Sequence, residues 1–196
     1  VLKSIGFVPN VVDPCVMNTI RNGKQLTLAI YVDDILALSE NAQDLEWLDK
    51  ELKRSFEEVK TEFSDDFSFL GMHILMEHGR VRVSMKSFVE DLLILHGDTN
   101  LKVTPADSRL FDSVKSGDAE ELSDKMKQDF HTMVAKLLYL SKRTRPDIAL
   151  PVAYLCTRVT CPTRSDAKKL DRIMGYLKMT RSREVVLTVN GPWRVS

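Results

Sequence analysis

The spacing of apolar residues changes its period near residue 85 of this chain. Before that point, short apolar runs alternate with polar turns, as in the strands of an antiparallel sheet. After it, apolar residues recur every three or four positions, which is the spacing of helices that bury one face. The pattern predicts an α+β chain in which a sheet-rich part is followed by a helical part.

Two apolar runs early in the chain predict a β-hairpin. Residues 26–32 and 35–38 are almost entirely apolar, and only Asp33 and Asp34 separate them. A break of two residues is the usual length of a tight hairpin turn. We therefore predict antiparallel strands over 26–38, with the two aspartates at the tip.

A helix and two further strands are expected in the same part of the chain. Asn41 is a good N-cap residue, and apolar residues at helical spacing follow it: Leu45, Leu48, Leu52, Phe56 and Val59. Residues 67–75 and 80–85 predict two strands joined by a short turn. Ser87 and Glu90 have the spacing of a capping box, which predicts the start of another helix.

The later part of the chain combines a long polar segment with helices. Residues 97–122 are rich in Gly, Asp, Ser and Thr, which predicts a surface loop or a linker. A helix is predicted over 123–143, and Thr-x-x-Asp capping boxes are predicted at 144–147 and 163–166. Residues 185–189 predict a short strand with almost no partner. The side chains expected to point inward are Phe130, Val134, Leu137, Leu138, Leu170, Ile173, Met174 and Leu177.

Composition narrows the class of protein. The chain is 43% apolar and 29% charged, which is typical of a folded domain. No apolar run reaches the roughly 18 residues that cross a bilayer, and the start of the chain lacks the zones of a signal peptide. We therefore expect neither a membrane protein nor a secreted one. The three cysteines fit no disulfide framework or zinc motif.

Charge is distributed unevenly along the chain. Residues 1–100 hold 10 basic and 17 acidic residues, whereas residues 101–196 hold 18 basic and 11 acidic ones. Within 123–183 there are 14 basic and 5 acidic residues. This asymmetry favours cation binding in the first half and a polyanion near the second. A chance distribution of charge is the alternative.

Asp33 and Asp34 are the candidate chemical site. A two-residue turn favours Gly or Asn because it needs positive φ angles, and two adjacent carboxylates repel each other. Apolar strands on both sides predict a turn close to a core, where carboxylates are unfavourable unless a cation pairs with them. Mg²⁺ prefers carboxylate and phosphate oxygens, and two such ions about 4 Å apart can activate a 3′-hydroxyl and stabilise a leaving pyrophosphate. A solvated surface turn is the alternative.

Several short motifs resemble, in their order, the reverse transcriptase in the Pol polyprotein of copia-type long-terminal-repeat retrotransposons. They are Gly6-Phe7, Asp13-Pro14-Cys15, Tyr31-Val32-Asp33-Asp34, Phe69-Leu70-Gly71, Thr104-Pro105, Leu137-Leu138-Tyr139-Leu140, Thr144-Arg145-Pro146-Asp147-Ile148 and Tyr176-Leu177-Lys178-Met179-Thr180. The resemblance implies the later part of a polymerase palm over 1–84, a helical thumb over 85–183, and the start of the connection to RNase H over 184–196.

The resemblance also implies an activity and roles for residues. The parent enzyme would add deoxynucleotides to the 3′ end of a primer on an RNA or DNA template, with Mg²⁺ as cofactor. Asp33 would be the principal metal ligand and Asp34 the weaker one. The residues implied beside the substrate or primer end are Tyr31, Val32, Phe69, Leu70 and Gly71. The basic residues expected to contact the nucleic-acid backbone are Arg143, Arg145, Arg164, Lys168, Lys169 and Arg172, with a merely solvated helix face as the alternative.

The family places a further metal-binding aspartate and the fingers upstream of the segments matched here. RNase H and integrase domains are expected elsewhere in the parent polyprotein, which would act in cytoplasmic virus-like particles. We therefore expect this chain alone to be inactive as a polymerase. A non-catalytic retrotransposon remnant that binds nucleic acid weakly is the alternative interpretation.

Overall fold

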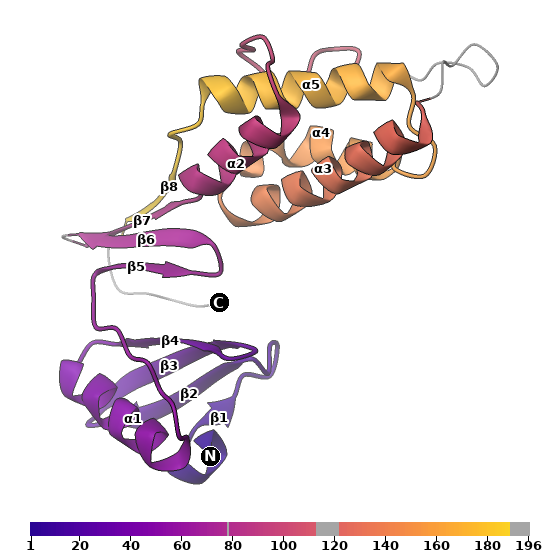
Figure 1. Cartoon of the computed structure of the whole chain (residues 1–196). Coiled ribbons are helices and arrows are strands. Elements are labelled where there is room, and N and C mark those ends of the chain that lie inside the picture. The colour runs from indigo at the N-terminus through magenta and orange to yellow at the C-terminus, as the bar shows by residue number, and fades with distance from the viewer. Residues whose placement is uncertain (78, 113–121, 189–196) are drawn as a thin grey trace. The chain divides into compact units, whose positions relative to one another are not determined.

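Antiparallel sheets and helices build two separate units, Val1–Ser64 and Asp65–Ser196 (Figure 1). The computed structural model describes all residues except 78, 113–121 and 189–196. The division after Ser64 precedes the sequence-based boundary at residue 84, because the strands between these points pair within the second unit.

The first unit is a four-stranded antiparallel sheet with a helix on one face. The strands follow chain order: β1 (Val8–Pro9), β2 (Val16–Arg21), β3 (Lys24–Tyr31) and β4 (Asp34–Ser39). A 3₁₀ helix, η1 (Leu2–Ile5), precedes them and helix α1 (Ala42–Ser55) follows. The core between sheet and helix consists of Phe7, Met17, Leu26, Leu28, Leu48 and Leu52.

Helix α1 begins where the sequence predicted, after Asn41, but it ends earlier than predicted. The Asn41 side chain accepts a hydrogen bond from the Gln43 amide at 3.1 Å, as an N-cap does. The helix ends at Ser55, so Phe56 lies outside the predicted apolar face and is 50% exposed. Leu48 and Leu52 are buried as expected.

The second unit begins with another antiparallel sheet. Its strands are β5 (Asp66–Phe69), β6 (Met72–Glu77), β7 (Arg80–Ser84) and β8 (Val185–Thr188), in that order. The single strand predicted over 67–75 is wrong, because positive φ angles at Leu70 and Gly71 turn the chain back on itself. The strand predicted near the end has a partner after all: Val185 pairs with Val83 of β7. Residue 189 lies outside the described residues.

Helices pack beside this sheet around the larger core. They are α2 (Lys86–His96), α3 (Asp124–Arg143), α4 (Ala149–Cys156) and α5 (Arg164–Met179), with a 3₁₀ turn, η2 (Pro146–Ile148), before α4. The fully buried side chains of this core include Leu137, Leu140, Ile148, Val152, Leu155, Ile173, Met174 and Leu177. Leu138, predicted to point inward, is 37% exposed. None of the helices in the described part of the chain has the length and apolarity that would let it span a bilayer.

The three predicted capping boxes have different outcomes. The box at 163–166 is confirmed, because the Thr163 hydroxyl accepts from the Asp166 amide and the Asp166 carboxylate accepts from the Thr163 amide. The box at 87–90 is absent: Met85 precedes α2 without a capping side chain. The box at 144–147 is also absent, because the Asp147 carboxylate binds the Arg145 side chain instead.

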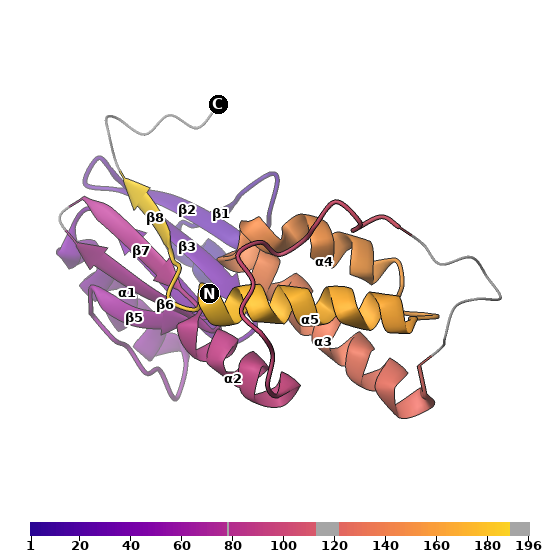
Figure 2. The same ribbon diagram turned by 90° about the horizontal axis from the view of Figure 1, so that it is seen from above.

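Residues 97–112, termed the strap, lie along α5 (Figure 2). Lys178 Nζ donates to Asp98 Oδ1 at 2.8 Å, and the Lys102 amide donates to the Gly175 carbonyl at 3.2 Å. Further along, Arg172 Nη2 donates to the Thr104 hydroxyl at 3.0 Å. The strap is therefore bound to the helix rather than being a linker. Residues 113–121 of the predicted loop lie outside the described residues.

Candidate functional site

The predicted hairpin at the acidic motif is confirmed, with its turn one residue earlier than expected. Tyr31 pairs with Asp34, so Val32 and Asp33 are the two central residues of the turn. Of these two, only Val32 has a positive φ, 55°. The signs match a type II′ turn, in which Gly is usual at the first central position. A β-branched residue in this conformation is strained, and such strain is characteristic of functional sites.

The two carboxylates extend into solvent. Asp33 and Asp34 are both exposed, Val32 is 87% exposed, and neither carboxylate has a hydrogen bond or ion pair with any described residue. The expectation that the turn lies close to a core is therefore wrong. The core of this sheet is centred on Leu26 and Leu28, well before the tip.

The described residues at this tip offer carboxylate oxygens but do not form a complete metal site. Two adjacent carboxylates without a counter-ion offer the oxygen ligands that Mg²⁺ prefers. Within the described residues, however, no group of three or more His, Cys, Asp or Glu side chains could hold a metal ion. Asp13 is engaged elsewhere, since its carboxylate accepts from the Cys15 amide at 2.9 Å as a turn residue does. The pair fits a divalent cation only if further ligands come from outside the described residues.

A second strained turn lies in the other unit. Leu70 and Gly71 connect β5 to β6 with φ angles of 50° and 69°. Phe69 and Leu70 are half-buried and Gly71 is exposed. The hydroxyl of Tyr139 on α3 donates to the Leu70 carbonyl at 2.7 Å. The family resemblance implied that Phe69, Leu70 and Gly71 lie beside a primer end, but it did not identify Tyr139.

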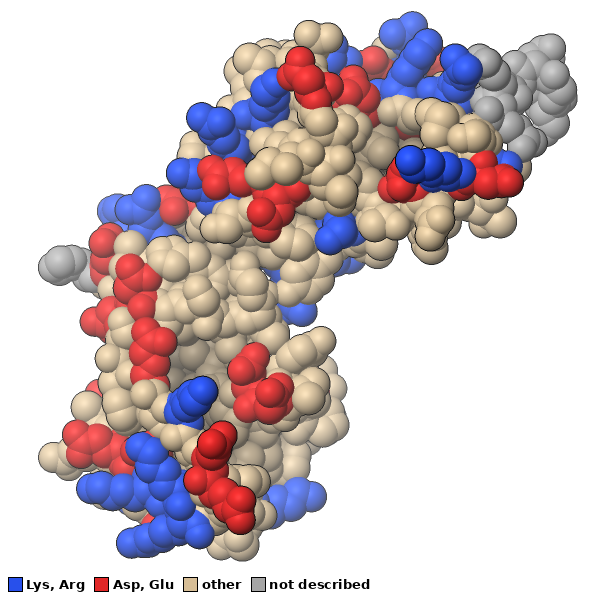
Figure 3. Space-filling view, in the orientation of Figure 1, with Lys and Arg blue, Asp and Glu red and all other residues tan. Residues whose placement is uncertain are grey.

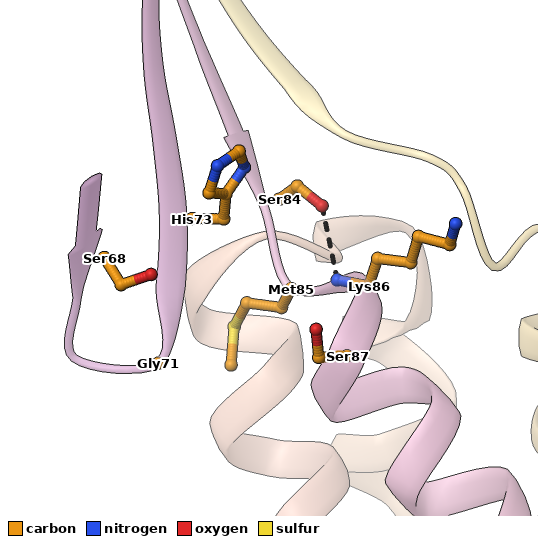
Figure 4. Close-up of a pocket in the computed structure, with 7 residues that line it drawn as sticks. All are labelled: Ser68, Gly71, His73, Ser84, Met85, Lys86 and Ser87. Atoms are coloured by element: carbon orange, nitrogen blue, oxygen red, sulfur yellow. Dashed lines mark hydrogen bonds between the residues drawn. The ribbon is translucent and has the colours of Figure 1, made fainter. Parts of the chain in front are cut away.

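A cavity of about 410 Å³ lies next to this turn (Figure 4). Its lining comes from β5, β6 and the β7–α2 junction: Ser68, Gly71, His73, Ser84, Met85, Lys86 and Ser87. The Lys86 amide donates to the Ser84 hydroxyl at 3.2 Å, and the Met85 side chain points toward Gly71. Most of the lining residues have polar side chains, including Lys86, but apolar atoms make up the larger part of the wall.

Arg145, predicted to contact nucleic acid, is part of the interior of the second unit. It is 2% exposed, and its Nε and Nη2 donate to the two Asp147 carboxylate oxygens at 3.0 and 2.9 Å. Its Nη1 donates to the Thr180 carbonyl at 3.1 Å, and Tyr176 also donates to Asp147, at 2.7 Å. Burial alone would raise the pKa of Asp147, but the hydrogen bonds from Arg145 and Tyr176 outweigh it and hold that pKa below its ordinary value. We no longer assign Arg145 a contact with nucleic acid.

Two predicted contacts on α5 also serve the fold. Lys169 Nζ donates to the Asp112 carbonyl at 2.8 Å and to the Tyr154 hydroxyl at 3.1 Å. Arg172 lies 3.4 Å from Asp107 and binds the strap. Acidic and basic side chains are intermixed on the surface of the helical part of this unit (Figure 3). Two of the four basic residues predicted on α5 are therefore bonded to neighbouring segments of the same unit.

Three of the six basic residues keep exposed side chains. They are Arg143, Arg164 and Lys168. Arg143 lies over the ring of Tyr139, with its guanidinium carbon 5.2 Å from the ring centroid. Lys168 has no bonded partner in the described part of the chain. These three are the exposed candidates for a phosphate contact, whereas Lys169 and Arg172 are partly buried.

Comparison with known proteins relates the chain to mobile elements. It is 26% identical over 186 residues to the retrovirus-related Pol polyprotein from transposon TNT 1-94 of Nicotiana tabacum, over 91% of this chain and 14% of that protein. This chain is related to a transposon Pol polyprotein. It is also 31% identical over 155 residues to an uncharacterized mitochondrial protein of Arabidopsis thaliana, over 78% of this chain and 61% of that protein.

The chain thus spans about three fifths of one relative and one seventh of the other. No protein-family model matches it, and no solved structure matches it. The Nicotiana tabacum relative supports the Pol-polyprotein part of the sequence-based interpretation.

Proposed function

We propose that this chain is part of the RNA-directed DNA polymerase of a copia-type retrotransposon. Its sheets would belong to the palm and its later helices to the thumb. The observation that supports this most is the exposed Tyr31–Asp34 turn, which combines a strained Val32 with two carboxylates that have no described partner. The relation to a transposon Pol polyprotein supports it independently.

The turn has features that do not favour folding. A positive φ at a β-branched residue costs about 1–3 kcal/mol, and adjacent like charges repel each other. A polymerase site has a use for the paired carboxylates, because it must present carboxylate oxygens at an exposed point that a primer end can reach. When bound there, Mg²⁺ would supply activation of the primer hydroxyl and stabilisation of the leaving pyrophosphate. Tyr31, which is 55% exposed, would lie beside the reacting groups.

The Leu70–Gly71 turn supplies the proposed contact with the primer. If a Cβ were added to Gly71, the nearest atom beyond its chain neighbours would be the methyl carbon of Met85, at 3.9 Å. A nucleic-acid backbone can therefore approach the turn closely. The cavity beside it carries Lys86, whose charge suits a phosphate. A template–primer of RNA or DNA and deoxynucleotides are the partners of this proposal.

Paramagnetic Mn²⁺ tests the metal site, because it prefers the same oxygen ligands as Mg²⁺. We expect low concentrations of Mn²⁺ to broaden the backbone amide signals of residues 31–35 in the NMR spectrum of the full chain. Replacing Asp33 and Asp34 together by Asn should abolish this broadening. Glu57→Gln with Glu58→Gln is the matched control, since these residues are also adjacent, acidic and exposed in the same unit.

A template–primer should lower the Mn²⁺ concentration needed, because its phosphates would complete the coordination. Broadening that is equal at residues 57–58, or that persists without Asp33 and Asp34, would contradict the proposal. The chain would then match the alternative of a non-catalytic remnant.

A further inference from the structure

Tyr139 connects three elements of the second unit at one point. Its hydroxyl donates to the Leu70 carbonyl in the β5–β6 turn at 2.7 Å. Its ring meets Phe88 of α2 edge to face, with 5.8 Å between ring centroids. The Arg143 guanidinium lies over the same ring, from one helical turn further along α3. The ring is thus fixed by its neighbours and the hydroxyl is directed at the turn.

The turn needs such support. Leu70 has a φ of 50°, a conformation that a residue with a side chain avoids unless its surroundings impose it. Strand β5 has only four residues and lies at the edge of the sheet, so β6 alone pairs with it. The Tyr139 hydrogen bond is therefore the contact that ties the Leu70 carbonyl to the helices.

We propose that Tyr139 is a positioning residue that holds the Leu70–Gly71 turn in the shape that meets the primer end. This rests on the proposed polymerase function. The hydroxyl holds the turn through its hydrogen bond to the Leu70 carbonyl, and the packing of the ring fixes the position of the hydroxyl. Arg143, whose side chain is exposed above the ring, is placed by the same contact at the edge of the primer path.

The test separates the hydroxyl from the ring. The full chain is bound to a template–primer whose 3′-terminal base is 4-thiothymidine, and near-ultraviolet light crosslinks that base to the protein. We expect the crosslink to fall on the peptide that carries Gly71. In Tyr139→Phe the yield at equal saturation should fall roughly fivefold, the factor that corresponds to loss of one hydrogen bond. The dissociation constant should stay close to that of the wild type, and the melting temperature should fall by only the roughly 2–4 °C that loss of about 1 kcal/mol costs in a unit of this size.

Tyr154→Phe is the matched control. Its hydroxyl accepts a hydrogen bond from Lys169 Nζ at 3.1 Å in the same unit, but Tyr154 lies on α4, and none of its described hydrogen bonds or ring contacts involves the turn. This variant should crosslink like the wild type. In Tyr139→Phe, hydrogen exchange of the Gly71 and Met72 amides should become faster, which shows the turn loosening directly.

Equal crosslinking by wild type and Tyr139→Phe overturns the inference and leaves the proposed function intact. An equal loss in Tyr154→Phe also overturns it, because general loosening of the unit would then explain both results. A wild-type chain that binds no template–primer, or crosslinks elsewhere, overturns the proposed function and the role of Tyr139 with it.

Discussion

Replacement of Gly175 by Ala should destabilise the second unit, although Ala is the better helix former. Gly175 lies in α5 where the strap crosses it. A Cβ at this position would be 2.1 Å from the Asn100 carbonyl oxygen and 3.0 Å from the Lys102 Cγ. The closer atom belongs to the backbone, so rotation of a side chain cannot relieve the clash. The strap must move away from the helix.

The magnitude follows from three contributions. Forcing an extra methyl group into a packed contact costs about 1–3 kcal/mol. Moving the strap also weakens the hydrogen bond from the Lys102 amide to the Gly175 carbonyl, worth about 1 kcal/mol. The higher helix propensity of Ala offsets up to about 1 kcal/mol of this loss. We expect a net loss of about 1–3 kcal/mol, and each kcal/mol lowers the melting temperature of a unit this size by about 2–4 °C.

Urea unfolding followed by far-ultraviolet circular dichroism measures the loss, and hydrogen exchange locates it. Amides of the strap should exchange faster in Gly175→Ala, whereas those of α1 in the first unit should not change. Lys168→Ala is the control in the same helix, because this exposed side chain has no described partner and should change stability by less than about 0.5 kcal/mol. A Gly175→Ala chain as stable as the wild type would refute the steric argument.

Four further outcomes are expected. Val32→Gly should stabilise the first unit against urea by about 0.5–1 kcal/mol, because relief of the strain at the positive φ exceeds the entropy cost of Gly. A variant less stable than the wild type would show that Val32 is not strained. The lowered pKa of Asp147 means that its contribution is present above the unfolded value of about 3.9 and is lost as pH falls through the lower folded value. Acid titration of stability should therefore be shallower in Asp147→Asn, and identical curves would show that this carboxyl contributes nothing. Arg172→Glu should lower the unfolding midpoint whereas Lys168→Glu should not, since Arg172 binds the strap and Lys168 has no described partner. Equal midpoints would show that the contact of Arg172 with the strap does not contribute to stability. Purified 1–196 with Mg²⁺ should not extend a primer, because the described residues provide too few metal ligands, and extension that Asp33→Asn abolishes would disprove this.

Apolar pattern predicted the hairpin but misplaced its turn. The sequence assigns Val32 to the strand because Val is apolar and β-branched, and such residues favour extended backbone. In the structure Val32 occupies the left-handed region instead, and Asp34 begins the next strand. The Leu70–Gly71 turn was missed for a similar reason, since Leu70 continues an apolar run. Local preference fails where the backbone is strained.

The count of basic residues was a poor guide to which side chains in the second half of the chain could contact nucleic acid. Composition along the chain cannot show that Arg145 is buried, because one of its partners, Thr180, lies 35 positions away. Lys169 and Arg172 likewise bind acceptors on a segment that sequence treats as a loop. Tyr139 carried a weak signal, as the polar member of an apolar motif on a helix with Arg143 four positions later.

The pairing of β7 with β8 makes the order of synthesis matter for this protein. The Arg82 side chain binds Glu184, 102 positions later, and between them the ribosome produces all of α2, α3, α4 and α5. At about 5–20 residues per second, β7 stays an open edge in the nascent chain for roughly 5–20 s. Helices form from local contacts in far less time, whereas distant strand pairing is slow. The helices should therefore assemble first, and Arg80 and Arg82 would discourage other strands from joining the edge until β8 arrives.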